Sequence, residues 1–218
     1  GSTQAISSLK FQPDFLWIKR RNGTNAHALF DSIRGVTKAL ESSNTGAEKT
    51  NDPAIASFDS NGFTVNGTYN QTNASGGTYV AWAWKAGGTA SSNTDGTITS
   101  QVSASPEYGF SVVSYTGNGT IGATFGHGLN AKPGLILVKG RDTSDNWVVY
   151  HSSLGATKFL WLNSSDSAYT GINRWNNTEP TSSVVTLYSD ISVNQSSSDY
   201  IAYCFAPVEG YSAFGSYT

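Results

Sequence analysis

The sequence contains no methionine, one cysteine and few charged residues. Lys, Arg, Asp and Glu account for only 13% of its 218 residues, about half of the usual share. The single cysteine, Cys204, excludes an internal disulfide. The net charge is −2 and the pI about 5.9, so there is no basic stripe and nucleic acid is not an expected partner. The missing methionine suggests a segment cut from a longer chain.

Long apolar runs are also missing. None approaches the roughly 18 residues of a membrane helix, so no membrane insertion is expected, and no secretory signal peptide is visible. Hydroxyls, amides and glycines are abundant instead, with 31 Ser, 23 Thr, 17 Asn and 23 Gly residues. Aromatic residues still make up 12% of the chain, which argues against a disordered polar tract. Such a composition suits secreted or virion proteins, and the length fits one large all-β domain or two domains of about 100 residues.

The chain contains an internal repeat. Pro13 to Lys19 align with Pro133 to Lys139, and Tyr79 to Trp84 align with Tyr200 to Phe205. A shorter block between them, Phe63 to Asn66, matches residues 191–194 in the same order. We therefore expect two homologous units, at residues 3–88 and 97–209.

Residues 210–218 resemble residues 109–116, the segment that opens the second copy. The first copy lacks this opening strand. Residues 210–218 are therefore a candidate opening strand of a further repeat. For the first copy two interpretations stay open: its opening strand was trimmed away, or the C-terminal strand fills the vacancy, closes the two units on each other and removes an exposed sheet edge.

The pattern of secondary structure is β throughout. Leu29, Ile33, Val36 and Leu40 have helical spacing, but the aligned stretch of copy two has β-branched and aromatic runs around Gly155, so both are expected to be hairpins. Further strands are expected at residues 96–103, 110–115 and 120–125, after a loop at 87–93. We expect an all-β fold with two tandem homologous β-sandwich units of jelly-roll or lectin-like type, joined by Gly/Asn/Ser-rich turns.

The closing strands predict which residues enter a core. Trp82 and Trp84 alternate with Ala81 and Ala83, so the large rings are expected to face a thick core. Cys204 takes the place of Ala83 in the second copy and is expected to be a small buried hydrophobe.

No motif indicates a metal, a cofactor or catalysis. HExxH, paired-cysteine, EF-hand and GxSxG patterns are absent, and the scattered histidines His27, His127 and His151 are expected to be structural or solvated. Loop aspartates such as Asp142 and Asp145 are expected to be turn residues. The protein is expected not to be an enzyme; the alternative is a polysaccharide hydrolase with two carboxylates in a cleft.

Several charged and glycine residues recur in both copies: Lys19 and Lys139, Arg21 and Arg141, Gly35 and Gly155. They indicate either two equivalent binding sites or a shared turn with charges at strand ends. The second interpretation is preferred, because a turn that specifies the fold recurs with the fold.

The candidate ligand-binding residues lie mainly in one loop of copy two. Trp175 is flanked by Arg174, Asn176 and Asn177, and Arg141 completes the set. An aromatic face beside amides and a guanidinium matches the needs of sugar binding. The alternative is that Trp175 folds back to cap the sandwich, whereas Trp147 and Trp161 are expected in the core.

Four blocks resemble repeat modules of marine bacteriophage virion proteins of the tail-fibre or concanavalin A-like lectin/glucanase type: residues 13–19, 79–88, 115–119 and 200–205. The resemblance implies a virion location, other virion proteins as partners and, as in phage fibres, a homotrimer. It transfers no catalytic residue. The function expected is non-catalytic binding of host-envelope glycans or another host receptor, strengthened by multivalency. The alternative is a structural spacer without a ligand, which predicts a buried Trp175 and no aromatic loop cluster.

Overall fold

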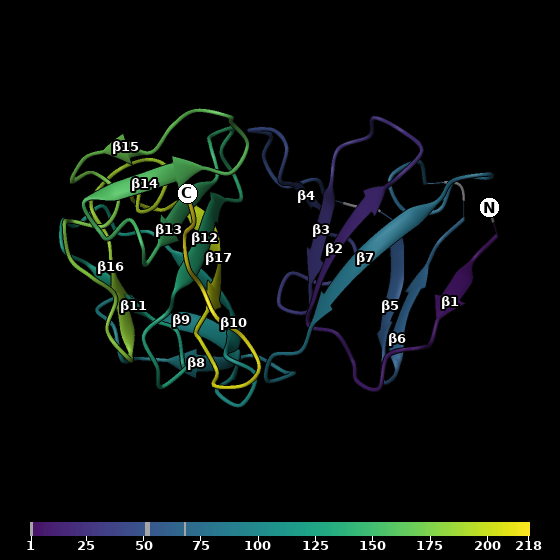
Figure 1. The fold of residues 1–218 in the computed structure, drawn as a ribbon, viewed down its shortest axis with the longest axis horizontal. Helices are drawn as coiled ribbons and strands as arrows, with labels where there is room; N and C mark the ends of the chain where they lie inside the picture. Colours follow the sequence, from purple (N-terminus) through teal and green to yellow (C-terminus); the bar gives the residue numbers. More distant parts are fainter. Residues whose placement is uncertain (1, 51–52, 68) are drawn as a thin grey trace.

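The computed structural model describes residues 2–50, 53–67 and 69–218, and the protein is all-β. Within those ranges the chain forms strands and turns and contains no helix that could span a membrane. The strands of the first unit lie on one side of Figure 1 and those of the second unit on the other. In chain order they are β1 (Gln4–Ile6), β2 (Phe15–Arg20), β3 (Ala28–Asp31), β4 (Leu40–Glu41), β5 (Ile55–Asp59), β6 (Gly62–Val65), β7 (Tyr79–Trp84), β8 (Ser91–Asn93), β9 (Ser100–Ser105), β10 (Phe110–Thr116), β11 (Thr124–Gly126), β12 (Leu135–Gly140), β13 (Val148–His151), β14 (Lys158–Trp161), β15 (Tyr169–Thr170), β16 (Val184–Thr186) and β17 (Asp199–Phe205).

The first unit packs two sheets against each other. One has the order β4-β3-β2-β7 and the other β1-β6-β5. Alternate residues of β2, such as Leu16 and Ile18, point to the second sheet and meet Phe63 and Val65 from β6. The resulting core makes this half a small sandwich.

The second unit is built on an eight-stranded sheet of order β15-β14-β13-β12-β17-β10-β9-β8. A two-stranded sheet, β11-β16, and the loops around it cover one face. Phe125 and Val185 from these strands pack with Val113 and Tyr115 of β10 in the main core. This half is also a sandwich, with unequal sheets.

Strand order and register are the same in four strands of each unit. The order β4-β3-β2-β7 matches β14-β13-β12-β17, and Phe15 pairs with Trp84 as Leu135 pairs with Phe205. The duplication itself rests on the sequence, and this equal topology is what it predicts.

Both hairpins have the expected strand-turn-strand form. β3 and β4 flank a turn in which Gly35 has a φ of 84°. Gly155, with a φ of 73°, occupies the same turn between β13 and β14. A left-handed residue favours glycine, so the shared glycines have a structural reason to recur.

Several local expectations were wrong. Residues 91–93, expected in a loop, form β8, because they find a partner in β9. The strands expected at 96–103 and 120–125 shrink to β9, which begins at Ser100, and β11, which begins at Thr124. Residues 191–194, aligned with β6, form turns.

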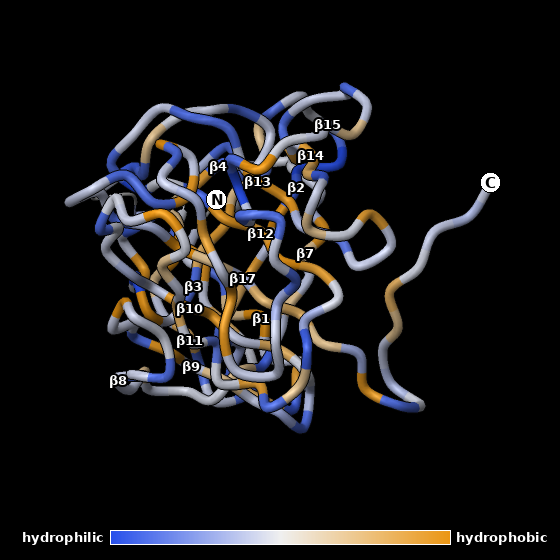
Figure 2. Tube along the Cα trace, turned by 90° about the vertical axis from the view of Figure 1, so that its left-hand side faces the viewer, coloured by the Kyte–Doolittle hydropathy of each residue, from blue (hydrophilic) through white to orange (hydrophobic). Residues whose placement is uncertain are grey.

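The C-terminal segment does not form a strand. Val208 and Ser212 make an isolated bridge, and residues 213–218 have no regular structure. In Figure 2 this end leads away from the body of the protein.

The two units contact each other face to face. The outer face of the four-stranded sheet packs on the eight-stranded sheet, with Phe15, Leu29, Val112 and Tyr203 in a shared apolar cluster. The rings of Phe15 and Tyr203 stack with centroids 4.1 Å apart. This apolar seam fixes the position of the two sites described below.

Candidate functional site

The loop around Trp175 does not present an aromatic face to solvent. Trp175 is only 1% exposed and packs edge-on against Tyr150 at 5.9 Å in the main core. The expectation of an exposed sugar-stacking ring is therefore wrong, and Trp175 folds back to cap the sandwich. Its apolar area outweighs the cost of its indole N–H, which finds no partner.

Arg174 is engaged within the same core. Its Nη1 pairs with Asp190 Oδ2 at 2.7 Å, and its guanidinium lies 4.8 Å from the ring centres of both Phe159 and Trp161. Because the guanidinium of Arg174 is already paired with a carboxylate and two aromatic rings, it is not available to a ligand. Arg174 therefore serves the packing of this loop.

Asn176 and Asn177 have a turn role. Both have a φ of 50°, in the left-handed region that asparagine tolerates. Asn177 is exposed, but without the Trp175 ring beside it the loop has no stacking platform.

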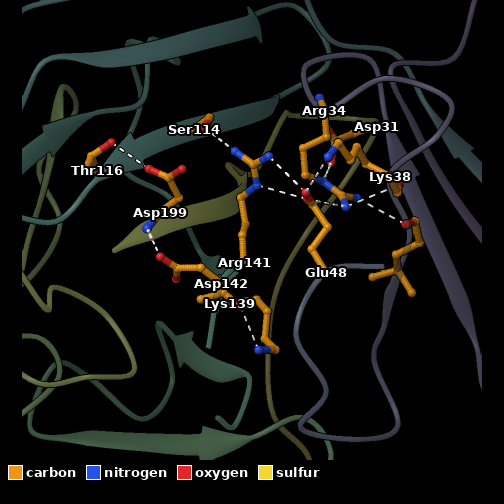
Figure 3. A network of polar contacts seen from close by, with 12 residues as sticks. Asp31, Arg34, Lys38, Glu48, Ser114, Thr116, Lys139, Arg141, Asp142 and Asp199 are labelled. Carbon is orange, nitrogen blue, oxygen red and sulfur yellow. Dashed lines mark hydrogen bonds and ion pairs between the residues drawn. The ribbon is translucent and has the colours of Figure 1, made fainter. Parts of the chain in front are cut away.

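Arg141, the fifth candidate, joins the two units (Figure 3). Its Nε and Nη2 bond Glu48 Oε2 and Oε1 at 3.0 and 3.1 Å. Arg34 reaches the same carboxylate with Nη1 at 3.2 Å. The backbone N–H of Glu48 also donates to the carbonyl of Arg141 at 2.7 Å. Lys38 Nζ lies 3.8 Å from Glu48 Oε1, so three cations hold one buried carboxylate, and Arg141 is not free for a ligand.

A buried cluster continues this network beneath the seam. Asp31 Oδ2 accepts from Arg34 Nε at 2.5 Å and from the Tyr203 hydroxyl at 2.8 Å. Burial raises the pKa of Tyr203 well above its ordinary value, and Asp31 adds to this effect. Burial alone would lower the pKa of Arg34, but Asp31, Tyr203 and Glu48 raise it above its ordinary value. Arg34 therefore stays charged, and its contacts and those of Asp31 with Tyr203 link the two units.

The lysines shared by the copies hold loops. Lys19 Nζ donates to the carbonyls of Gly23 and Asn25 at 3.0 and 2.9 Å. Lys139 Nζ donates to those of Gly140 and Thr143 at 2.7 and 2.9 Å. Burial lowers the pKa of Lys139 to about 8. One acceptor lies at the same aligned position in both copies, Gly23 in the first and Thr143 in the second, and this shared contact supports the structural interpretation.

No metal site forms among the described residues, which contain no group of three His, Cys, Asp or Glu side chains close together. Asp142 accepts from the backbone N–H of Asp199, and Asp145 accepts from Ser192. His127 is buried, and burial lowers its pKa.

A groove lined by aromatic side chains opens instead on the first unit. Trp17, His27, Trp82 and Trp84, from β2, β7 and the loop before β3, surround a hollow of about 290 Å³. We call these four residues the aromatic groove. Trp82 is 46% exposed, whereas Trp17 and Trp84 are half-buried at the edge of the inter-unit cluster.

Strand alternation explains this arrangement. Trp82 and Trp84 share a face of β7, and Trp17 is the partner of Trp82 on β2. Trp84 lies where the second unit covers the sheet, 5.9 Å from Phe205. Trp82 lies outside the inter-unit cluster, so the expectation that it faces a thick core was wrong. Its counterpart, Tyr203, is covered by Phe15.

One polar contact fixes the floor of the groove. The indole Nε1–H of Trp17 donates to Nδ1 of His27 at 2.7 Å. Because Nδ1 accepts, the neutral ring carries its proton on Nε2, which leaves a donor. Burial lowers the pKa of His27, and Lys19 lowers it further. The groove thus offers apolar rings and a neutral imidazole.

The indole rings and the neutral imidazole of the aromatic groove can pack against the apolar face of an uncharged ligand. Among the residues that the structure describes, its lining contains no carboxylate. The same loop carries Asn25, which lines a second hollow of about 320 Å³ with Asn70 and Gln71. This loop therefore contributes the imidazole of His27 to one hollow and the amide of Asn25 to the other.

Sequence reasoning missed the aromatic groove. The alternation of Trp82 and Trp84 was visible, but it looks the same for a buried face and for an exposed one. The cover of β7 differs from that of β17, because β7 ends its sheet among the described strands whereas β17 lies between β12 and β10.

A comparison with protein-family models gives one family, described as "Domain of unknown function (DUF7483)", which matches residues 1–218. No curated protein and no solved structure matches the chain.

Proposed function

Because the chain belongs to the DUF7483 family, whose description names no activity, we propose a function from the geometry: a non-catalytic module that binds a neutral polysaccharide through the aromatic groove. The setting proposed is the surface of a phage particle, and the polysaccharide is one of the host envelope. The resemblance of the four sequence blocks to phage virion modules supports the setting.

The exposed ring of Trp82 carries the proposal. A sugar ring presents C–H groups on one face, and these pack on an indole while its hydroxyls bond to nearby donors. Trp82 offers the exposed face, Trp17 and Trp84 form the sides, and His27 Nε2–H is the donor. Single sites of this size bind weakly, and many copies on one particle raise the overall affinity.

A structural module without a ligand is the second candidate. It is favoured by the burial of Trp175 and by the ion pairs of Glu48 with Arg34 and Arg141 between the units. A purely structural module does not explain why the aromatic groove is exposed.

A binding panel of bacterial envelope polysaccharides separates these candidates. We expect saturable binding that Trp82→Ala abolishes and Trp82→Tyr, the residue of the second copy at this position, partly keeps. Tyr169→Ala, which removes an exposed ring on β15, serves as the control and is expected to bind normally. The same samples are assayed for new reducing ends, which we expect to be absent. Equal binding by Trp82→Ala and the unmodified protein would reject the groove, and new reducing ends would identify a hydrolase.

A further inference from the structure

The outer edge of β7 has no partner among the described strands. β7 ends the sheet β4-β3-β2-β7, whereas its counterpart β17 lies between β12 and β10. The edge is six residues long and uncharged, with the sequence YVAWAW. Such an edge is a template for another strand.

The backbone groups of this edge point outward at known positions. The carbonyls of Thr78 and Trp84 accept from Arg21 and Asp14 on the β2 side, at 2.7 and 2.8 Å. Since backbone groups alternate along a strand, Ala81 and its neighbours two residues away direct their N–H and C=O groups away from β2. The matching residue of β17, Ala202, faces β10.

A hollow lies beside the same edge, on the side of β7 away from the second unit. It measures about 420 Å³ and is lined by core-facing residues that include Ile18, Phe63, Tyr79 and Ala81. We call it the edge slot. Thr72 also lines it and is only 4% exposed. Its hydroxyl oxygen Oγ1 is buried and has no hydrogen-bond partner. An unpartnered hydroxyl indicates a missing polar group.

In the second unit, the position that corresponds to the edge slot is filled by a side chain of β10. Tyr115 of β10 stacks on Tyr200 with centroids 5.2 Å apart, and its hydroxyl donates to the carbonyl of Val193 at 2.6 Å. Tyr79 is the counterpart of Tyr200 and is held in the same way. Its hydroxyl donates to Asn70 and accepts from Ala74, as that of Tyr200 donates to Ile191 and accepts from Gln195. The edge slot lacks only the second tyrosine.

The sequence that fits is in this chain. Residues 210–218 resemble residues 109–116, and the alignment places Tyr217 on Tyr115. Tyr217 is 99% exposed. The eight residues from Tyr211 onward have no charged side chain, and neither has β7.

We propose that the β7 edge and the edge slot accept residues 211–218 of a second copy of this chain as an added strand, with Tyr217 as the plug. The tail of the same copy is held elsewhere. Phe214 packs near Phe205, at 6.5 Å, in a hollow that Trp17 and Trp84 also line. That hollow is on the opposite face of β7 from the edge slot, and Figure 2 shows the end leading away from the body.

The contact is head to tail, because a donor tail meets an acceptor edge. Each copy then offers one donor tail and one acceptor edge, so copies join in a ring or a linear array. Main-chain hydrogen bonds supply affinity, and the slot supplies specificity for an aromatic side chain. This inference does not depend on the polysaccharide site.

Sedimentation of the full chain at low and high concentration tests the proposal, together with hydrogen exchange of the β7 amides. We expect the mass to rise with concentration while the amide of Ala81 becomes protected. Ala81→Pro removes an outward N–H without breaking the β2–β7 ladder, a position where an edge strand tolerates proline. It should abolish association, and Ala81→Ser should keep it.

Tyr217→Ala provides the second arm, because this residue is exposed and its loss leaves the fold intact. It should abolish association, and Tyr169→Ala should not. A monomer at every concentration overturns the proposal, as does association that survives Ala81→Pro or Tyr217→Ala. Protection of β7 without a change in mass would assign the edge to the tail of the same copy and reject the second copy.

Discussion

The indole Nε1–H of Trp17 donates to Nδ1 of His27 over 2.7 Å, and this bond sets the tautomer of the only histidine in the aromatic groove. A protonated His27 would place an N–H against another N–H. The groove as it stands therefore requires a neutral imidazole.

Acid should weaken the groove. Burial and Lys19 lower the pKa of His27 in the folded protein, so its contribution to stability is present above the unfolded value of about 6.5 and lost as pH falls through the lower folded value. A pH titration of tryptophan fluorescence should show a transition below pH 6.5 that His27→Gln removes. His151→Gln serves as the control and should keep the transition.

Glu48→Gln should loosen the two units. It removes the charge that Arg34 and Arg141 share, and lost hydrogen bonds to charged groups cost about 1.5–3 kcal/mol of the free energy of unfolding. Urea denaturation measures this loss, and the exposed Glu209→Gln is the control. An unchanged unfolding midpoint would contradict the role given to Glu48.

Acid should act on the same contact. Burial raises the pKa of Glu48, but Arg141 and Arg34 outweigh it and the net pKa is lowered. The stabilisation is therefore present above the unfolded pKa and lost as pH falls through the lower folded one. The difference in stability between the unmodified protein and Glu48→Gln should shrink on acidification from pH 7 to below pH 4.

The Trp175→Ala protein should unfold more easily than the unmodified protein. The buried ring should make no direct contact with a ligand. Removing a buried tryptophan costs about 3–5 kcal/mol. Trp175→Phe should cost less, because the indole N–H has no partner to lose. Thermal melts give the order, and a Trp175→Ala protein as stable as the unmodified one would contradict the burial.

Cys204 should resist thiol reagents in the folded protein. It is fully buried, and burial raises the pKa of its thiol to about 12, so little thiolate forms at neutral pH. Reaction with a coloured disulfide reagent should follow the rate of unfolding by urea. A fast reaction before unfolding would show that the site is open.

The sequence could predict those elements whose signal is repeated. The hairpin around Gly35 was recognisable because Gly155 sits in clearer strand context. Strand β8 was not, because Ser91 to Asn93 carry no β-branched or aromatic residue and pair only because β9 is beside them. The burial of Trp175 and the exposure of Trp82 depend on which sheets cover them. A single strand pattern does not record that relationship.

The most direct test of the proposed function follows the six indole N–H signals by NMR during titration with oligosaccharides from an envelope polysaccharide. The groove account predicts that the signals of Trp17, Trp82 and Trp84 shift together, while those of Trp147, Trp161 and Trp175 stay in place. Saturable binding that leaves the signals of the aromatic groove unmoved, or moves only the other three, would contradict it.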